Sequence, residues 1–422
     1  LLNWALCAQT LRIYHIDVEQ GASTLLVSPS GKTLLIDAGK NGHGERVKSV
    51  LQAAGVERIN HLVVTHYHED HYGGADELAP FVVERAYDRG GKDELSPEDQ
   101  SEDAFVKYQR SVGENAAHLA RGEAIEFDPL VTVTCVASGG IVPGELDPVA
   151  GEDENDKSIA LHIEFGDFRF FIGGDIELTT EGKIAARDLV LEVDLYQANH
   201  HGSHTSSSLA FMEDLRPAVV VISNGNHGGY KHPRQHTLNL LAGLDPRPKV
   251  FQTNKYLKGG LGGNVEDAQI ADLESIDSDG TILVTVDAAR GLYTLSYGEA
   301  RHEFPIKPRA PPAVSPIVIA SLLPDPTDAP DREGEEVTLR NRTGANISLS
   351  GWMLKDQNNL AWPLESLGTL EARAQKTIRR NGLPMSLNNE GDTIRLLDPG
   401  NQLVDRFAYT NSQPGIRINT GR

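Results

Sequence analysis

Thr65-His66-Tyr67-His68-Glu69-Asp70-His71-Tyr72-Gly73-Gly74 follows directly on the apolar run Leu62-Val63-Val64. The apolar run predicts a short buried strand, and the glycine pair with its polar neighbours predicts the loop after that strand. Residues 66–71 contain three histidines and two carboxylates. Imidazole nitrogen and carboxylate oxygen are the ligands expected for zinc, manganese or iron rather than for calcium. Because a solvated loop has no need of histidines at alternate positions, the stretch predicts a metal site.

Three further apolar runs end in a carboxylate or in a histidine pair. Residues 34–36 lead into Asp37, residues 170–172 lead into Asp175 through a Gly-Gly pair, and residues 195–197 lead into His200 and His201. One such end is ordinary turn chemistry. Together with the first stretch, they predict that side chains from four strand ends meet at one site.

The length of 422 residues exceeds a usual single core and favours two domains. The proline-rich segment 307–316 cannot form a helix or a central strand, so it predicts a linker between a first domain at 9–306 and a second at 317–422. In the first domain, strands are expected at 11–16, 33–36, 62–64, 159–165, 169–172 and 219–222, and helices at 45–54 and 103–120. This mixture predicts layered sheets covered by helices. The acidic segments 98–103 and 152–156 are expected to be solvent-facing loops, unless a metal captures one of them.

The net charge of −21 is unevenly distributed. From residue 313 onward there are 12 Lys plus Arg against 13 Asp plus Glu, so nearly all of the net negative charge lies before residue 313. Such a domain repels nucleic-acid phosphates at long range. This argues against a nucleic-acid-binding protein with a basic surface, but less against a metal-centred hydrolase, because bound ions dominate the local charge.

Cys7 and Cys135 are the only cysteines, which excludes a disulfide framework and a thiolate-rich metal site. No run of about twenty apolar residues predicts a transmembrane helix. Residues 1–10 are similar to the end of a signal-peptide apolar region with a cleavage site after Ala8, which predicts a secreted or extracytoplasmic protein. The alternative is an arbitrary chain boundary.

The motifs resemble the metallo-β-lactamase fold superfamily, whose His-x-His-x-Asp-His pattern is matched by residues 66–71. More narrowly, residues 11–300 resemble the extracellular hydrolase domain of ComEC-type DNA-uptake proteins. The matching stretches are 15–21, 173–175, 200–203 and 230–233. The resemblance implies an α+β fold, with an αββα sandwich in the first domain.

The resemblance also implies two divalent metal ions, zinc or manganese. In this reading His66 and His68 hold the first ion, Asp70 and His71 hold the second, and Asp175 bridges the two.

The other implied ligands are less completely specified. His200 or His201 completes the second site, and His201 is favoured because many family members have His followed by Gly there. The first site normally takes a third histidine, which this chain lacks; Asn155 or Asp156 then supplies an oxygen ligand, or the site is weak and open. An oxygen ligand favours manganese over zinc. Asp37 is expected to orient a ligand imidazole from behind.

Two ions about 3.5–4 Å apart share a hydroxide and neutralise charge on the attacked group, which suits phosphodiesters. The expected catalytic or substrate-binding residues are Asp70, His232, Ser203 and Arg89. His232 protonates the leaving oxygen or binds a phosphate oxygen, unless it is a surface-loop histidine. Ser203 donates a hydrogen bond to substrate or caps a helix, and Arg89 contacts an anion.

The second domain shows strands of alternating pattern at 335–341, 347–356, 391–398 and 403–407, which predict an all-β sandwich. The segments 349–356 and 391–398 are similar to the lamin-tail domain, and this resemblance covers residues 314–412 and implies an immunoglobulin-like fold. Trp352 is expected in the core rather than in a ligand site. The implied module is an accessory one that binds DNA, protein or a cell-surface polymer.

Three functions remain open. The first is an exported metal-dependent phosphodiesterase or nuclease, which the ComEC-like motifs favour. The second is a lactonase, esterase or β-lactamase of the same fold. The third is a binding protein with a decayed first site, against which the intact histidine and aspartate set argues.

Overall fold

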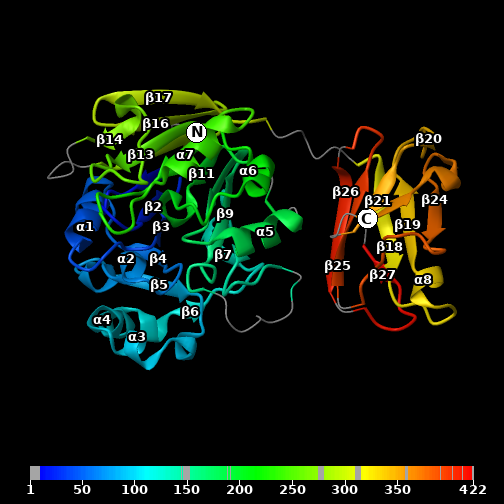
Figure 1. Cartoon of the computed structure of the whole chain (residues 1–422), viewed down its shortest axis with the longest axis horizontal. Coiled ribbons are helices and arrows are strands. Elements are labelled where there is room, and N and C mark those ends of the chain that lie inside the picture. The colour runs from blue at the N-terminus through cyan, green and yellow to red at the C-terminus, as the bar shows by residue number, and fades with distance from the viewer. Residues whose placement is uncertain are drawn as a thin grey trace, which may run out of the picture. The chain divides into compact units, whose positions relative to one another are not determined.

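The computed structural model describes residues 10–143, 145, 153–187, 189–190, 192–273, 280–308, 315–356, 360–389, 391–401, 403–410 and 412–420. After Pro308 the chain divides into two compact units, here called the first and second domains (Figure 1). The predicted signal-peptide remnant, with Cys7, and most of the predicted linker lie outside the described residues. No helix that the structure describes is both long and apolar enough to cross a membrane.

The first domain contains two large sheets. The nine-stranded sheet has the order β17-β16-β15-β1-β2-β3-β4-β5-β6, and the eight-stranded sheet has the order β14-β13-β12-β11-β10-β9-β8-β7. The first sheet comprises β1 (Leu11–His15), β2 (Thr24–Val27), β3 (Thr33–Ile36), β4 (Ile59–Val63), β5 (Val83–Asp88), β6 (Ala117–His118), β15 (Ile282–Asp287), β16 (Leu292–Tyr297) and β17 (Ala300–Pro305). The second comprises β7 (Ala124–Asp128), β8 (Val131–Ala137), β9 (Ala160–Phe165), β10 (Phe168–Ile172), β11 (Leu195–Gln197), β12 (Val219–Ile222), β13 (Lys249–Asn254) and β14 (Ile270–Asp272).

Alternating side chains place each sheet between two apolar layers. Leu34 and Ile36 face the core between the sheets, whereas Leu35 faces a second core under the helices of the first sheet. Val221 likewise faces the inter-sheet core, while Val220 packs under the helices of the second sheet. Because successive strand residues point to opposite faces, apolar residues at every position predict a strand covered on both sides.

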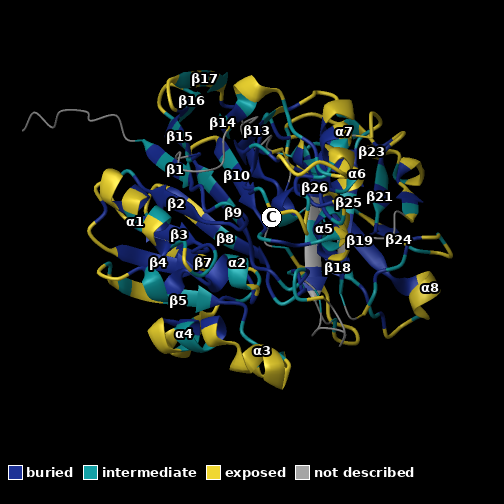
Figure 2. Ribbon diagram, turned by 60° about the vertical axis from the view of Figure 1, so that its left-hand side comes forward, coloured by how far each residue is buried: buried dark blue, intermediate teal, exposed yellow. Residues whose placement is uncertain are grey.

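Helices form the two outer layers. α1 (Gly44–Ala53) and α4 (Asp103–Ser111) contribute to the core of the first sheet, and α5 (Leu178–Ala186), α6 (Leu209–Leu215) and α7 (Gln235–Gly243) to that of the second. Figure 2 shows buried strands between helices whose outer faces are exposed. The arrangement is the expected αββα sandwich.

Two secondary-structure expectations for this domain were wrong, and Asp156, in the acidic segment expected to face solvent, is buried. The helix expected at 103–120 ends at Ser111, because residues 113–115 form a separate turn and residues 117–118 pair with β5 as the edge strand β6. Residues 98–103 are exposed, as expected, but helical: Ser96 caps α3 (Pro97–Ser101) by accepting a hydrogen bond from the Asp99 N–H, with proline in the first turn.

The described residues of the second domain form strands, a short α-helix and a 3-10 helical turn at Glu365–Leu367. Its four-stranded sheets have the orders β24-β19-β18-β27 and β22-β21-β25-β26, and β20 pairs with β23. The elements are β18 (Ile317–Leu323), α8 (Asp331–Gly334), β19 (Glu336–Asn341), β20 (Ile347–Ser348), β21 (Met353–Lys355), β22 (Ala361–Pro363), β23 (Thr369–Leu370), β24 (Gln375–Arg379), β25 (Gly391–Leu397), β26 (Leu403–Thr410) and β27 (Ile418–Asn419). Trp352 and Trp362 lie in one buried core with residues of both larger sheets, which confirms Trp352 as a core residue.

Candidate metal centre

The polar strand ends of the first domain meet in a cavity of about 650 Å³. β4 leads to His66 and to the short helix α2 (Glu69–Tyr72), β10 leads to Asp175, and β11 leads to the turn Asn199–Gly202. Within each sheet the relevant strands are parallel, so their carboxyl ends lie at the same edge. The predicted residues that line the cavity are His68, Asp70, Asn155, Asp175, His200, His201 and His232.

One cluster of potential ligands contains His66, His71 and Asp175. Their candidate ligand atoms all lie within 4.8 Å of one another. His71 Nε2 is 3.3 Å from Asp175 Oδ1, and His66 Nε2 is 3.0 Å from His68 Nδ1. Burial holds the pKa of His66 well below its usual range, and the nearby His71 lowers it further. His66 is therefore neutral at pH 7, the state in which imidazole binds metal.

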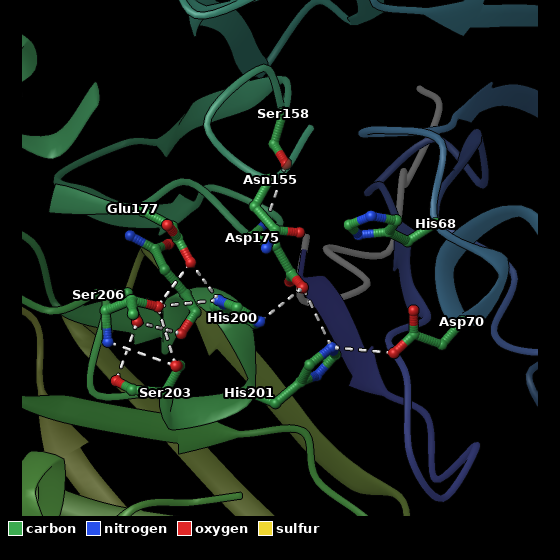
Figure 3. A network of polar contacts seen from close by, with 12 residues as sticks. His68, Asp70, Asn155, Ser158, Asp175, Glu177, His200, His201, Ser203 and Ser206 are labelled. Atoms are coloured by element: carbon green, nitrogen blue, oxygen red, sulfur yellow. Dashed lines mark hydrogen bonds and ion pairs between the residues drawn. The ribbon is translucent and has the colours of Figure 1, made fainter. Parts of the chain in front are cut away.

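A second cluster contains Asp70, His71 and His201, and thus shares His71 with the first. His201 Nε2 lies 3.5 Å from Asp70 Oδ2 and 3.5 Å from Asp175 Oδ2. Figure 3 shows His201 between these two carboxylates. Two overlapping clusters with a carboxylate between them are suited to two neighbouring ions.

Acceptors behind the rings fix the orientation of two histidines. His71 Nδ1 is 2.7 Å from Asp37 Oδ2, and the Asp37 carboxylate also accepts hydrogen bonds from the Thr65 N–H and hydroxyl. His201 Nδ1 is 3.0 Å from the backbone oxygen of Ser223. An acceptor at Nδ1 leaves Nε2 free to face the cavity. Asp37 thus lies where a residue that orients a ligand imidazole is needed.

The turn that carries His200 and His201 is strained. Both residues have left-handed backbones, with φ of 48° and 52°, a conformation that costs about 1–3 kcal/mol for a non-glycine residue. The buried Glu181 holds the turn, because its carboxylate accepts hydrogen bonds from Asn199 Nδ2, the Ser207 N–H and the Ser208 N–H at 2.8, 2.6 and 2.7 Å. A strained turn that several surrounding hydrogen bonds hold in place is typical of a functional site.

His200 and His201 face different partners. His200 Nδ1 lies 3.0 Å from Glu177 Oε1, which also accepts a hydrogen bond from the Thr205 hydroxyl. His200 Nε2 lies 3.8 Å from Asp175 Oδ2, whereas His201 belongs to the second ligand cluster. The geometry favours His201 as the ligand of the pair, and it places His200 beside Asp175 at the cavity wall.

Asn155 and Asp156, the two candidates for a first-site oxygen ligand, have different environments. Asp156 Oδ1 accepts hydrogen bonds from the Glu177 and Thr180 N–H groups, so this carboxylate holds the N-terminus of α5. Asn155 lines the cavity beside Asp175 and His68 (Figure 3). Its Oδ1 is buried without a hydrogen-bond partner among the described residues. An orphaned amide oxygen at this place fits a metal ligand.

Arg89 does not lie where it would contact a substrate anion, contrary to the prediction. Its buried guanidinium donates to both carboxylate oxygens of Glu154, at 2.8 and 2.6 Å, and lies 4.5 Å from the centre of the Tyr67 ring. Glu154 also accepts a hydrogen bond from the Tyr67 N–H at 2.8 Å. This arrangement, here called the Glu154 clamp, ties the loop of Asn155 to the loop that carries His66 and His68.

Ser203 and His232 also differ from each other in placement. Ser203 is buried outside the cavity lining, and its hydroxyl pairs with Thr205 Oγ1 at 2.9 Å, so it supports the turn instead of facing substrate. His232 is buried at the cavity wall, with its ring 5.3 Å from that of His200, and is therefore no surface-loop histidine. Burial, together with His201 and His200, lowers the pKa of His232 to about 3.

Three carboxylates that organise the site escaped the sequence reasoning: Glu154, Glu177 and Glu181. Each is a single residue whose partners lie on other loops, so no spacing pattern marks it. Only Glu154 lies in a segment, 152–156, that the sequence analysis named, as an acidic stretch.

The residues present fit two divalent transition metals. Imidazole nitrogens and carboxylate oxygens converge from separate loops, two rings are held with Nε2 toward the cavity, and the Asn155 Oδ1 lacks a partner among the described residues. This donor set is typical of zinc or manganese.

Comparison with known families and proteins agrees with the fold. Residues 16–223 match the Metallo-beta-lactamase superfamily, and residues 310–411 match the Lamin Tail Domain. ComE operon protein 3 of Bacillus subtilis (strain 168) is 27% identical over 249 residues, which cover 54% of this chain and 30% of that protein. Competence protein ComA of Neisseria gonorrhoeae is 28% identical over 236 residues, covering 53% of this chain and 28% of that protein.

This chain therefore spans less than a third of the length of either relative. Among solved structures, a putative metal-dependent hydrolase from Parabacteroides distasonis ATCC 8503 matches with a TM-score of 0.37 and 14% identity, over 57% of this chain and 92% of that one. The chain thus joins a metallo-β-lactamase superfamily domain, related to those of ComEC-type competence proteins, to a lamin tail domain.

Proposed function

We propose that the first domain hydrolyses phosphodiesters, as a phosphodiesterase or nuclease, with two divalent metal ions held at the cavity. The observation that carries this proposal is the overlap of the two ligand clusters at one open cavity, with Asp175 in contact with residues of both. Two bound ions would supply an activated water and positive charge beside the attacked phosphorus.

The residues divide between two metal positions. His66, His68 and the Asn155 amide oxygen serve the first position, and Asp175 lies between it and the second. Asp70, His71 and His201 serve the second position.

An amide oxygen in place of a third imidazole favours a harder ion, manganese over zinc, at the first position. The burial of Asn155 Oδ1 without a partner among the described residues supports this assignment. Phosphate oxygens are likewise hard ligands, so the same preference suits a phosphodiester.

His232 serves as a neutral hydrogen-bonding group. Because burial and the neighbouring histidines lower its pKa to about 3, the ring is uncharged at pH 7 and donates one N–H. It lies beside His200 at the cavity wall, where that N–H can reach a phosphate oxygen or the leaving oxygen. Binding a substrate oxygen therefore suits His232 better than acting as a charged acid.

The substrate class is supported by the relatives. One of them is named a competence protein. The resemblance to the extracellular domain of ComEC-type DNA-uptake proteins supports a connection with DNA and an extracytoplasmic location. The strongly negative first domain makes divalent ions necessary for catalysis on long nucleic acids, because phosphate repulsion must be offset.

The test compares substrate classes on the metal-loaded full-length protein. We expect manganese-stimulated hydrolysis of bis-p-nitrophenyl phosphate and of DNA, and its loss in His68→Ala. The matched control His118→Ala changes an exposed histidine of β6 outside the cavity lining and should leave turnover unchanged. Hydrolysis of nitrocefin or a lactone without phosphodiester turnover would assign the domain as a β-lactamase, esterase or lactonase. Metal binding without hydrolysis of any of these substrates would favour a binding protein.

A further inference from the structure

Residues 223–263 form a basic segment in an acidic chain. They contain six Lys plus Arg and a single acidic residue, although the chain as a whole has a net charge of −21. The segment includes residues 226–231, after β12, and residues 255–262, after β13, here called the rim loops. Apart from His232 and the Ser223 backbone oxygen behind His201, nothing in this segment has a role in the proposed chemistry.

The two rim loops lie against each other. The Leu257 N–H donates a hydrogen bond to Asn226 Oδ1 at 2.9 Å. A Cβ on Gly228 would lie 3.8 Å from Lys258 Cγ, and a Cβ on Gly260 would lie 3.9 Å from Lys231 Cδ. Each lysine therefore extends over the opposite loop. Among the described residues, no carboxylate forms an ion pair with either ammonium group.

Aromatic rings connect the rim loops with the metal centre. Tyr230 is 53% exposed and lines the cavity. Its ring stacks on that of His232, 6.2 Å away at an interplanar angle of 10°, and lies 4.6 Å from the His227 ring. His232 in turn lies 5.3 Å from His200, which approaches Asp175. A row of rings thus runs from an exposed tyrosine to the ligand clusters.

We infer that the rim loops bind a single-stranded stretch of nucleic acid, with a base stacked on Tyr230 and flanking phosphates on Lys231 and Lys258. An exposed ring beside unpaired lysines is the combination that binds single strands without sequence preference. A base in an intact duplex is stacked and paired, so it cannot place its face on Tyr230. The inference rests on the proposed phosphodiesterase function and adds the form of its substrate.

The test measures binding of a fluorescent, nuclease-resistant phosphorothioate dT12 to the manganese-loaded full-length protein. An abasic strand of the same length keeps the phosphates and lacks the bases. Tyr230→Ala should weaken dT12 binding by about 5- to 100-fold, the worth of one stacked base. Its affinity for the abasic strand should not change, and Tyr230→Phe should bind both strands as the wild type does.

A second pair of variants measures the contribution of charge to binding separately from that of base stacking. Lys258→Ala should weaken both strands alike and flatten the slope of log affinity against log salt by about 0.7. Lys249→Ala is the matched control, because Lys249 begins β13 at the end opposite the rim loops and should have no effect.

The outcomes distinguish this inference from the function on which it rests. Unchanged dT12 binding by Tyr230→Ala, in a protein that hydrolyses bis-p-nitrophenyl phosphate, would overturn the inference alone. Tighter binding of a duplex than of dT12 would also overturn it. Absence of turnover on every phosphodiester would overturn the proposed function, and the binding comparison would still report on the rim loops.

Discussion

Carboxylates in the core of the second domain and carboxylates at the metal centre have different kinds of partner. In the second domain, Glu335 accepts a hydrogen bond from the Leu387 N–H at 2.9 Å and pairs with Arg380 at 3.1 Å, while Asp405 accepts one from the Ile319 N–H at 2.7 Å. In the first domain, Asp70 and Asp175 face imidazoles across a cavity. The former hold backbone and side chains in place, whereas the latter face a space that a cation can occupy.

The largest expected effect comes from exchanging one carboxylate of each kind. Asp175→Asn should lower phosphodiester turnover by about 10³-fold or more and reduce metal content, because Asp175 contacts both ligand clusters. Its far-UV circular dichroism should stay that of the wild type. Asp405→Ala should do the reverse: full turnover, with unfolding of the second domain easier by about 1–3 kcal/mol, since the Ile319 N–H loses its acceptor. Wild-type turnover in Asp175→Asn would refute its assignment.

Glu154 belongs to neither kind, because it ties two ligand loops together through Tyr67 and Arg89. Glu154→Gln removes the charge that holds Arg89 and should weaken metal binding at the position nearest Asn155 by about 10- to 100-fold. The measurement is metal content after dialysis against graded chelator. Glu84→Gln changes a matched but exposed Glu–Arg pair, with Arg58 at 2.9 Å, and should bind metal normally. Equal metal retention in the two variants would show that the Glu154 clamp does not position the site.

The facing charges should also make the metal-free protein sensitive to pH. Burial alone would lower the pKa of His201, but Asp175 and Asp70 raise it from 6.5 to about 10. A raised histidine pKa stabilises the fold below the unfolded value, and this stabilisation is lost as pH rises through the folded value. Between pH 6.5 and 10 the melting temperature should therefore fall more steeply without metal than with it, because bound ions displace the proton. Parallel melting curves with and without chelator would contradict this.

The smallest effect on catalysis is expected from removing the second domain. The cut belongs after Pro308, because the Lys307 N–H donates to Asp194 Oδ1 at 2.8 Å within the first domain. The truncated protein should turn over bis-p-nitrophenyl phosphate within about 2-fold of the full chain, since every cavity-lining residue that the structure describes lies before the cut. Binding of long DNA should change more. If a folded, metal-loaded truncated protein loses small-diester turnover, catalysis also requires the second domain, which contradicts this prediction.

The sequence predicted well what depends on local spacing. The His66–His71 run, Asp175 and the histidine pair at 200–201 each begin within three residues of the end of an apolar strand, so the apolar runs alone indicated that these side chains lie at strand ends. Placements that depend on a distant partner were not predictable in this way. The sequence offered Asp156 and Asn155 equally as the oxygen ligand, but the Asp156 carboxylate accepts hydrogen bonds from the first turn of α5. Arg89 was predicted to contact an anion, but its guanidinium binds the Glu154 carboxylate.

The most direct test of the two-metal site is metal content measured together with turnover. Protein purified without chelator should carry close to two transition-metal ions per chain, and the ion nearest Asn155 should leave first. Hydrolysis of bis-p-nitrophenyl phosphate should vanish in chelator and return in full only with the second equivalent of manganese. A preparation that binds no metal and remains active in chelator would contradict the two-metal assignment, as would full turnover with one ion per chain.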